Sequence, residues 1–316
     1  MTDRSIEFKS ERVFHKLYCE APENILAIEK AFQIKVVARG NVLHMEGAEK
    51  GMAKCEELFL LLENAKAQGF SIGKYDFLRF LEKVKSGKSV EIKELLNHPL
   101  KLKIRKKTVV PRNLGQRRFL DLILKNDLVF GIGPAGTGKT FLAMIAALHA
   151  LLEGQIDRIV LARPAVEAGE ALGFLPGDLE EKLLPYLRPL YDAMDEVLGP
   201  VEARKLVDTG VVEIAPLAYM RGRTLSRCFA LLDEAQNTTC SQMMMFLTRL
   251  GEGSKMVVTG DLTQVDLPAK EKSGLSQAKK ILSNVKGLYS HEFDHGHVLR
   301  HPLVSRIISA YGTDRS

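Results

Sequence analysis

The run from Leu128 to Thr140 reads LVFGIGPAGTGKT, and it decides the fold of this 316-residue chain. Its last eight residues fit the pattern G-x-x-x-x-G-K-S/T, in which glycines allow backbone N–H groups to surround a phosphate. An apolar strand precedes the pattern and an Ala/Leu-rich helix, 141–152, follows it, so the positive end of the helix dipole also faces the phosphate. The sequence therefore predicts a P-loop for the phosphates of ATP. The cofactor-binding residues predicted from it are Gly133, Pro134, Ala135, Gly136, Thr137, Gly138, Lys139 and Thr140.

Three polar side chains in and before this loop have predicted roles. Lys139 is expected to reach the β- and γ-phosphates, and the hydroxyl of Thr140 to ligate Mg²⁺. Gln116 lies upstream of the first core strand, at a spacing that would let its amide read the edge of an adenine base. The predicted cofactors are therefore ATP and Mg²⁺.

An acid pair ends the next informative strand, the apolar run from Cys228 to Leu232. Asp233, at the strand tip, is predicted to join the Mg²⁺ shell, and Glu234 to be the general base that polarises the attacking water. Two adjacent acids at the end of a buried run are costly unless a cation lies beside them. The pair is therefore expected to complete a site for hydrolysis of ATP.

A polar cluster also follows the strand at 255–259, where Gly260-Asp261 precedes Gln264. Open α/β sheets place their ligand sites at the carboxyl ends of such strands, so Gln264 is predicted to sense the γ-phosphate or its water. An ordinary turn built on Gly260-Asp261 is the alternative interpretation.

From residue 113 onward, short apolar strands alternate with helices, which predicts an α/β fold with a parallel sheet covered on both faces. The expected strands are 128–132, 158–162, 211–215, 229–232 and 255–259.

The part before residue 100 is predicted to be a small α+β domain of KH-like outline, β-α-β-β-α, that begins with a short strand at 15–20. Gly40 marks a hairpin between apolar runs at 34–38 and 42–45. The outline has no GxxG loop of the kind with which KH domains clamp nucleic acid. RNA binding, protein contact and a purely structural role all stay open for it. The predicted division is a domain at 1–100, a basic linker at 101–112 and a P-loop ATPase domain at 113–316.

Charge is concentrated in one stretch, although the net charge of the chain is only +6. Between residues 101 and 118 there are eight basic residues and no acid. Such a stripe is typical of a polyanion binder, and a solvated linker is the alternative. The basic residues are Lys101, Lys103, Arg105, Lys106, Lys107, Arg112, Arg117 and Arg118.

Composition argues against a secreted or membrane-spanning protein. The charged N-terminus has no apolar region typical of a secretory signal, and the longest nearly apolar run, 141–152, is too short to span a bilayer. The four cysteines are scattered with no CxxC pair, as in reduced cytosolic proteins. A cytoplasmic location is expected.

Several longer motifs resemble a known family. The P-loop, the run Asp233-Glu-Ala-Gln236 and Gly260-Asp261 resemble motifs of superfamily-one helicases. The stretches LARPAVEAGEALGFLPGD at 161–178 and PLAYMRGRT at 216–224 resemble the PhoH family more specifically. So do TRLG at 248–251 and LRHPLV at 299–304, and the resemblance covers about residues 110–312.

The resemblance implies a RecA-like ATPase core in the cytoplasm with a role in bacterial RNA metabolism. Helicase activity has been proposed for relatives, and the family is linked to an endoribonuclease partner. Two functions stay open: ATP hydrolysis coupled to remodelling of RNA, most simply single-stranded, and a slow ATP-dependent switch that regulates an RNA-processing partner without unwinding.

Superfamily-one helicases close ATP between two RecA-like domains, and this chain has room for one after residue 110. A second wall with an arginine finger would then come from another subunit, which predicts a homo-oligomeric ring, most simply a hexamer. Arg300 is the favoured finger, with Arg221 or Arg223 as alternatives. Arg163, Arg221 and Arg223 are also predicted contacts to nucleic acid.

Overall fold

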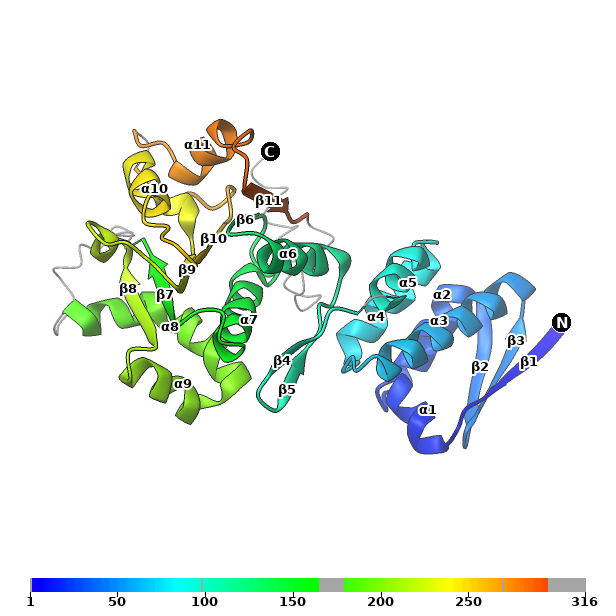
Figure 1. Ribbon diagram of the computed structural model, residues 1–316. Helices are drawn as coiled ribbons and strands as arrows, with labels where there is room; N and C mark the ends of the chain where they lie inside the picture. The colour runs from blue at the N-terminus through cyan, green and yellow to red at the C-terminus, as the bar shows by residue number, and fades with distance from the viewer. Residues whose placement is uncertain (1, 98, 165–178, 269, 295–316) are drawn as a thin grey trace. The chain divides into compact units, whose positions relative to one another are not determined.

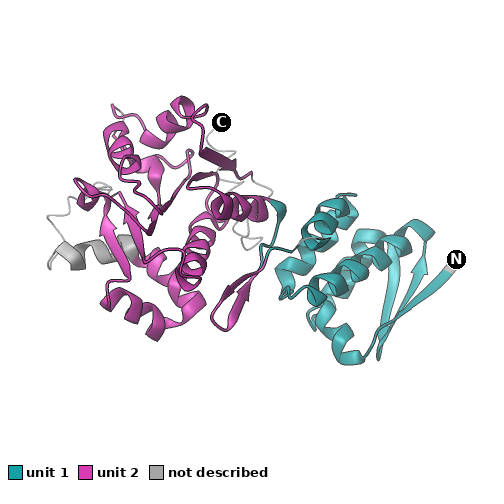
Figure 2. Ribbon diagram, viewed as in Figure 1, with its two compact units in different colours: residues 1–100, 110–114 teal, residues 101–109, 115–316 magenta. Residues whose placement is uncertain are grey.

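A computed structural model describes residues 2–97, 99–164, 179–268 and 270–294 (Figure 1). The chain divides into two compact units (Figure 2). The N-terminal unit comprises Met1–Leu100 with Val110–Leu114, and the P-loop unit comprises Lys101–Val109 with Gly115–Ser316. Each unit has its own sheet.

The N-terminal unit is built on a three-stranded antiparallel sheet in the order β1-β3-β2. Gly40, at φ +56°, makes the turn between β2 and β3, a conformation that glycine adopts without strain. This small α+β domain agrees with the predicted fold class. The strands are β1 (Thr2–Glu7), β2 (Ile34–Arg39) and β3 (Val42–Gly47), and the helices are α1 (Glu11–Leu17), α2 (Pro22–Phe32), α3 (Glu49–Ala67), α4 (Lys74–Lys85) and α5 (Ser89–Asn97).

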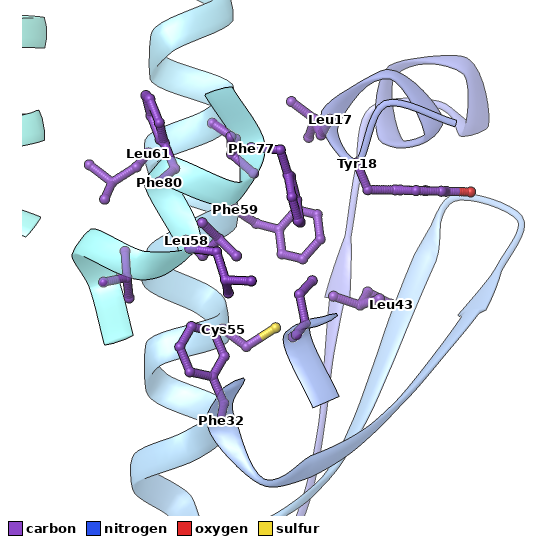
Figure 3. Close-up of a cluster of buried hydrophobic side chains, with 14 of the residues drawn as sticks. Leu17, Tyr18, Phe32, Leu43, Cys55, Leu58, Phe59, Leu61, Phe77 and Phe80 are labelled. Atoms are coloured by element: carbon purple, nitrogen blue, oxygen red, sulfur yellow. The ribbon is translucent and has the colours of Figure 1, made fainter. Parts of the chain in front are cut away.

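Aromatic and aliphatic side chains together fill the core of this unit (Figure 3). The rings of Phe8 and Phe14 stack with centroids 4.5 Å apart, and Phe59 of α3 meets Phe8 edge-on at 5.3 Å. Burying each such ring contributes roughly 1.5–3 kcal/mol. Cys55 lies in the same core, where burial raises the pKa of its thiol to about 12, so it packs as a small apolar residue.

Two local predictions for this unit were wrong. Residues 15–20, predicted as a strand, contain the end of α1, whose buried Phe14 and Leu17 lie three residues apart on one helical face. A short apolar run does not distinguish helix from strand by periodicity alone. Strand β1 was missed because Ile6 is its one large apolar residue. The observed order is therefore β-α-α-β-β-α-α-α.

The segment predicted as a basic linker, 101–112, contains an antiparallel hairpin of β4 (Leu102–Ile104) and β5 (Lys107–Val109). Leu102 and Ile104 are buried, and β4 contacts helix α7 (Lys139–Leu152) of the P-loop unit. The alternation of apolar and basic residues explains the difference, since it buries one face of the hairpin and leaves the basic side chains in solvent.

The P-loop unit is built on a six-stranded parallel sheet in the order β11-β6-β10-β9-β7-β8. Every residue of β9 is buried, as expected for a strand covered on both faces. The predicted α/β fold with a parallel sheet is confirmed, and this arrangement is the RecA-like core. The strands are β6 (Leu128–Ile132), β7 (Arg158–Arg163), β8 (Val212–Pro216), β9 (Cys228–Leu232), β10 (Lys255–Gly260) and β11 (Leu288–Glu292).

Helices cover this sheet (Figure 1). Met243 and Phe246 of α10 join Leu275 of α11 in one core cluster with the strands, while α7 contacts β7, β9 and β10. Among the helices in the described part of the chain, none is both long and apolar enough to cross a bilayer. Besides α7, the helices are α6 (Leu114–Lys125), α8 (Leu179–Leu198), α9 (Pro200–Asp208), α10 (Cys240–Leu247) and α11 (Gly274–Ile281), with short 3-10 turns η2 (Leu217–Met220) and η3 (Ala235–Asn237).

Strand β11 was not predicted from the sequence. Its residues LYSHE include few large apolar side chains, because it pairs with β6 alone at the edge of the sheet. Phe293 extends this pairing by donating its backbone N–H to the carbonyl of Ile132 at 2.8 Å. The P-loop thus begins beside a strand that comes from far along the chain.

Candidate functional site

The P-loop and the acid pair meet at one edge of the sheet, because the carboxyl ends of parallel strands lie together. Strand β10 lies between β6 and β9, so the segments that follow these three strands are neighbours. A pocket of about 430 Å³ opens there, a size typical of small-molecule sites, ~300–1,000 Å³. Its lining includes the predicted residues Ala135, Gly136, Gly138, Lys139, Thr140, Arg163, Asp233, Glu234 and Gln264.

The P-loop has the backbone that its glycines predict. Gly133 and Gly138 have φ values of +148° and +86°, which L side chains rarely adopt. A Cβ on Gly133 would also lie 2.6 Å from the carbonyl oxygen of Phe293. Helix α7 begins at Lys139, so its positive end faces the loop.

The ammonium group of Lys139 lies inside the loop. Its Nζ donates to the carbonyl oxygens of Gly133 at 2.6 Å and Pro134 at 2.9 Å, and the residue is 8% exposed. A buried ammonium group needs acceptors of this kind. The charge that the motif assigns to phosphate binding is therefore held at the centre of the cradle.

Thr140 and Asp233 lie together, as a shared metal site requires. The Thr140 hydroxyl donates to Asp233 Oδ1 at 2.7 Å, and Thr259 Oγ1 donates to the same oxygen at 2.7 Å. Thr259 is fully buried on β10 and was not predicted as a site residue. The sequence signal that could have identified Thr259 as a site residue is its place near the carboxyl end of an apolar strand.

The donor set fits Mg²⁺, which takes hard oxygen ligands and usually keeps several waters alongside one or two carboxylates. Within the described residues, no group of three or more His, Cys, Asp or Glu side chains is placed to hold a metal by itself. Thr140 and Asp233 therefore suit a metal that is shared with phosphates and water. They do not suit one enclosed by protein ligands.

Glu234 is held at both ends of its carboxylate. Oε1 accepts from Arg163 Nη2 at 3.1 Å, and Oε2 accepts from Gln236 Nε2 at 2.7 Å. The backbone of Glu234 is left-handed, with φ +52°, which is uncommon for a residue with a side chain. Neither contact was predicted, although Gln236 lies within the quoted Asp-Glu-Ala-Gln run.

Asp261 connects β10 to the P-loop. Its Oδ2 accepts from the backbone N–H of Ala135 at 3.0 Å, and its Oδ1 accepts from the hydroxyl of Thr263 at 2.7 Å. The backbone N–H of Gln264 donates to the carbonyl of Asp261 at 3.0 Å, which keeps Gln264 at the pocket wall. The turn after β10 is thus part of the site.

Gln116 is 4% exposed, and its Nε2 donates to the carbonyl oxygen of Thr137 in the P-loop at 3.0 Å. The residue supports the loop in this structure, and its reading of an adenine edge stays a prediction.

The other predicted arginines lie elsewhere. Arg223 makes a two-pronged ion pair with Glu213, at 2.5 and 2.7 Å, and Arg221 is exposed. The hydrogen bond from Arg223 holds the pKa of the Glu213 carboxyl below its usual range. Neither arginine is among the described residues that line the pocket, and Arg300 lies outside the described residues.

In this parallel sheet the P-loop follows β6, the Asp-Glu pair follows β9, and β10 lies between these two strands. This arrangement defines a P-loop NTPase fold with a nucleotide site. A family model described as PhoH-like protein matches residues 108–312. The chain belongs to this PhoH-like family, as its motifs predicted.

Relatives match over most of the chain. It is 47% identical over 284 residues to the PhoH-like protein of Bacillus subtilis, which covers 90% of this chain and 89% of that protein. It is 48% identical over 291 residues to the PhoH-like protein of Mycobacterium tuberculosis, which covers 92% and 82%. Among solved structures, the large terminase of a thermophilic bacteriophage is similar at 13% identity and a TM-score of 0.37, over 62% of this chain and 49% of the terminase.

Proposed function

We propose that this protein hydrolyses ATP with Mg²⁺ and couples hydrolysis to the binding and remodelling of RNA, in the manner of a helicase. The observation that carries the proposal is the 2.7 Å contact between Thr140 and Asp233, with Glu234 next in the chain at the same pocket. Metal ligands beside a carboxylate base are the arrangement that phosphoryl transfer to water requires.

Each residue has one task in this mechanism. A bound Mg²⁺ would be held by Thr140 and Asp233 and would neutralise charge on the β- and γ-phosphates. Thr259 fixes the Asp233 carboxylate through its hydrogen bond. Lys139 exchanges loop carbonyls for phosphate oxygens, and the charge-assisted bonds it then makes are stronger than those to carbonyls.

The water that attacks the γ-phosphate is oriented by Glu234, which accepts its proton, and by Gln264 on the β10 side of the pocket. The backbones of both residues belong to segments that follow neighbouring strands of the sheet, so the two side chains face the pocket from fixed positions.

RNA is the proposed polymer because the family that the motifs resemble acts in RNA metabolism, and because exposed basic residues, such as Lys103 and Lys106, gather in the β4–β5 hairpin. Such a surface binds the phosphate backbone in a salt-dependent manner. Arg163, Arg221 and Arg223 are proposed as further contacts, with Arg223 exchanging Glu213 for phosphate.

A second candidate is a slow ATP-dependent switch that regulates an endoribonuclease partner in the cytoplasm without unwinding RNA. It is favoured by the engaged state of the site, in which Lys139 bonds to loop carbonyls and both oxygens of Glu234 are occupied. An enzyme that rests in this state would turn over slowly until a partner released it.

A homo-oligomeric ring of six subunits is proposed to complete the site. The described residues that line the pocket include two cationic side chains, Lys139 and Arg163, against five carboxylates. A triphosphate would gain from a further cation, proposed as Arg300 of a neighbouring subunit, with Arg221 or Arg223 as alternatives. Rings that mix Arg300→Ala with Lys139→Ala subunits should recover some turnover, and no recovery in verified mixed rings would argue against Arg300.

The proposed function is tested by steady-state ATP hydrolysis with and without single-stranded RNA, at low and moderate salt. We expect Lys139→Ala to be inactive, and wild-type turnover to rise with RNA and to lose that rise as salt increases. Opening of an RNA duplex would favour remodelling. Slow turnover indifferent to RNA would favour the switch, and turnover that survives in Lys139→Ala would remove the P-loop assignment.

A further inference from the structure

The carboxylate of Glu234 is held from two sides, and the two holders differ in how firmly they are fixed. Gln236 donates its Nε2 to Glu234 at 2.7 Å, while its own Oε1 accepts from the backbone N–H of Asp261 at 3.0 Å. The amide of Gln236 is therefore tied into the turn after β10, and the residue is 1% exposed. Rotation of this amide away from Glu234 would break two hydrogen bonds in a buried place.

Arg163 holds the other oxygen from a strand end. Strand β7 pairs with β9, and the backbone N–H of Asp233 donates to the carbonyl of Ala162 at 3.0 Å. The backbones that carry Arg163 and Glu234 are thus locked side by side. The Arg163 side chain is 19% exposed and that of Glu234 is 37% exposed, and both line the pocket. Of the two contacts, the ion pair is the one that a ligand in the pocket can reach.

A phosphate group is a strong competitor for this guanidinium. Arginine offers a planar fork of N–H donors that matches phosphate in two-pronged geometry, and phosphate carries at least the charge of a carboxylate. The present contact uses one nitrogen, Nη2, on one carboxylate oxygen at 3.1 Å. Exchange of Glu234 for a phosphate would therefore replace a single contact by a better one.

We propose that Arg163 is a positioning residue that restrains Glu234 through this ion pair, and that a phosphate oxyanion which binds Arg163 frees the Glu234 carboxylate to accept the proton of the attacking water. The proposal deepens the proposed function and rests on Glu234 as its base. No covalent bond changes, because one ion pair is exchanged for another. The consequence is a coupling between phosphate binding at Arg163 and hydrolysis.

The phosphate has two possible sources, which share one chemistry. It is either the γ-phosphate of the nucleotide or a backbone phosphate of RNA. The first would make Arg163 distinguish ATP from ADP. The second would make Arg163 the link through which RNA accelerates turnover.

The test compares full-length wild type with Arg163→Ala, using poly(U) RNA as the probe. If RNA is the source, RNA-free kcat should rise about three- to fivefold in Arg163→Ala with a nearly unchanged KM for ATP, as loss of one partly exposed ion pair would give, and poly(U) should add nothing further to the variant. If the γ-phosphate is the source, bound ATP already relieves the restraint, so kcat should not rise, KM for ATP should increase, and the variant should lose its preference for a non-hydrolysable ATP analogue over ADP.

Further variants tie the effect to Glu234. Arg163→Ala combined with Glu234→Gln should lose the rise, because the released group is absent. Arg163→Lys keeps a cation at the strand end and should restore most of the restraint. Arg227→Ala is the matched control, since it removes another Arg–carboxylate pair, with Asp157, outside the described lining of the pocket.

The outcomes distinguish failure of the proposed ATP hydrolysis from failure of the proposed restraint by Arg163. A wild type without Lys139-dependent hydrolysis would overturn the proposed function itself. If wild type hydrolyses ATP but RNA-free kcat in Arg163→Ala stays equal or falls, with RNA response and ATP-to-ADP preference both unchanged, the restraint by Arg163 is overturned and the proposed function stands.

Discussion

The two units of this protein bury different kinds of side chain. In the N-terminal unit the core is aromatic and aliphatic, and among its described residues the buried polar ones are Asn24 and Ser89. In the P-loop unit the buried polar set is larger, and it includes Lys139, Asp233 and Thr259 at the pocket. Burial of polar groups costs free energy unless each finds a partner. The cost is concentrated where the proposed chemistry takes place.

The difference predicts two kinds of response to mutation. In the N-terminal unit the favourable free energy of folding comes from packing of apolar side chains, so a substitution in its core should lower stability. In the P-loop unit the buried polar side chains of the pocket have polar partners: Asp233 accepts from Thr259 and from the partly buried Thr140, and Lys139 donates to loop carbonyls. Substitutions there should act on turnover at least as strongly as on folding.

The largest expected effect is that of Glu234→Gln. The amide keeps the size of the side chain and loses the proton acceptor, so kcat should fall by about a factor of 10²–10⁴, the usual contribution of a general base. ATP should still bind, which is measured by titration with a fluorescent ATP analogue. Wild-type turnover in this variant would remove Glu234 as the base and would weaken the comparison between the units.

Phe59→Ala should have the next largest effect, on stability and not on turnover. The ring is 1% exposed and contacts Phe8 and Phe14. Its removal from a packed core should cost about 3–5 kcal/mol of unfolding free energy. The measurement is urea unfolding followed by circular dichroism, with RNA-free ATP turnover recorded on the same sample.

Leu60→Ala is the matched control for Phe59→Ala. Leu60 is the next residue of α3 and is 65% exposed, so its truncation should change stability by less than about 0.5 kcal/mol. If Phe59→Ala lowers the RNA-free ATP turnover of the folded protein as well as its unfolding free energy, the division of roles between the two units is wrong.

Thr259→Val should have an intermediate effect within the P-loop unit. Valine keeps the shape of threonine and removes the hydroxyl that donates to Asp233, so the carboxylate is less well oriented for Mg²⁺. We expect the Mg²⁺ concentration for half-maximal turnover to rise about tenfold, as loss of one outer hydrogen bond to a metal ligand gives. An unchanged requirement for Mg²⁺ would show that Thr259 serves packing alone.

Thr259 also shows what the sequence could and could not reveal. The P-loop and the acid pair lie in short continuous motifs, so Lys139, Thr140, Asp233 and Glu234 were available from pattern alone. The contact between Thr259 and Asp233 depends on β10 lying beside β9. Strand order is a property of the whole sheet, and no local pattern contains it.

The same reasoning explains the errors in the fold. The buried strands were predicted because parallel strands covered on both faces are almost wholly apolar. The edge strands β1 and β11 were missed, since one or both of their faces meet solvent and their residues are mixed. The hairpin at 102–109 was hidden by its charge, because basic residues outnumber the two buried apolar ones, Leu102 and Ile104.

The smallest expected effect concerns the ion pair of Arg223 with Glu213. The arginine lowers the pKa of Glu213 in the folded state, so the pair stabilises the fold above the unfolded pKa of about 4.3. That contribution is lost as pH falls through the lowered folded pKa. Both side chains are about a third exposed, at 29% and 34%. Solvent screening therefore limits the contribution to about 1 kcal/mol at neutral pH.

The measurement is the unfolding free energy of wild type and Glu213→Gln at neutral and acid pH. The two should differ at neutral pH and converge as pH falls through the lowered pKa of Glu213, because wild type alone loses the ion pair on protonation. Glu153→Gln, which removes an exposed carboxylate at the end of α7, is the control for the loss of one negative charge. A gap between wild type and Glu213→Gln that stays constant with pH would mean that Arg223 is held by packing, which would leave its guanidinium poorly placed to exchange Glu213 for phosphate.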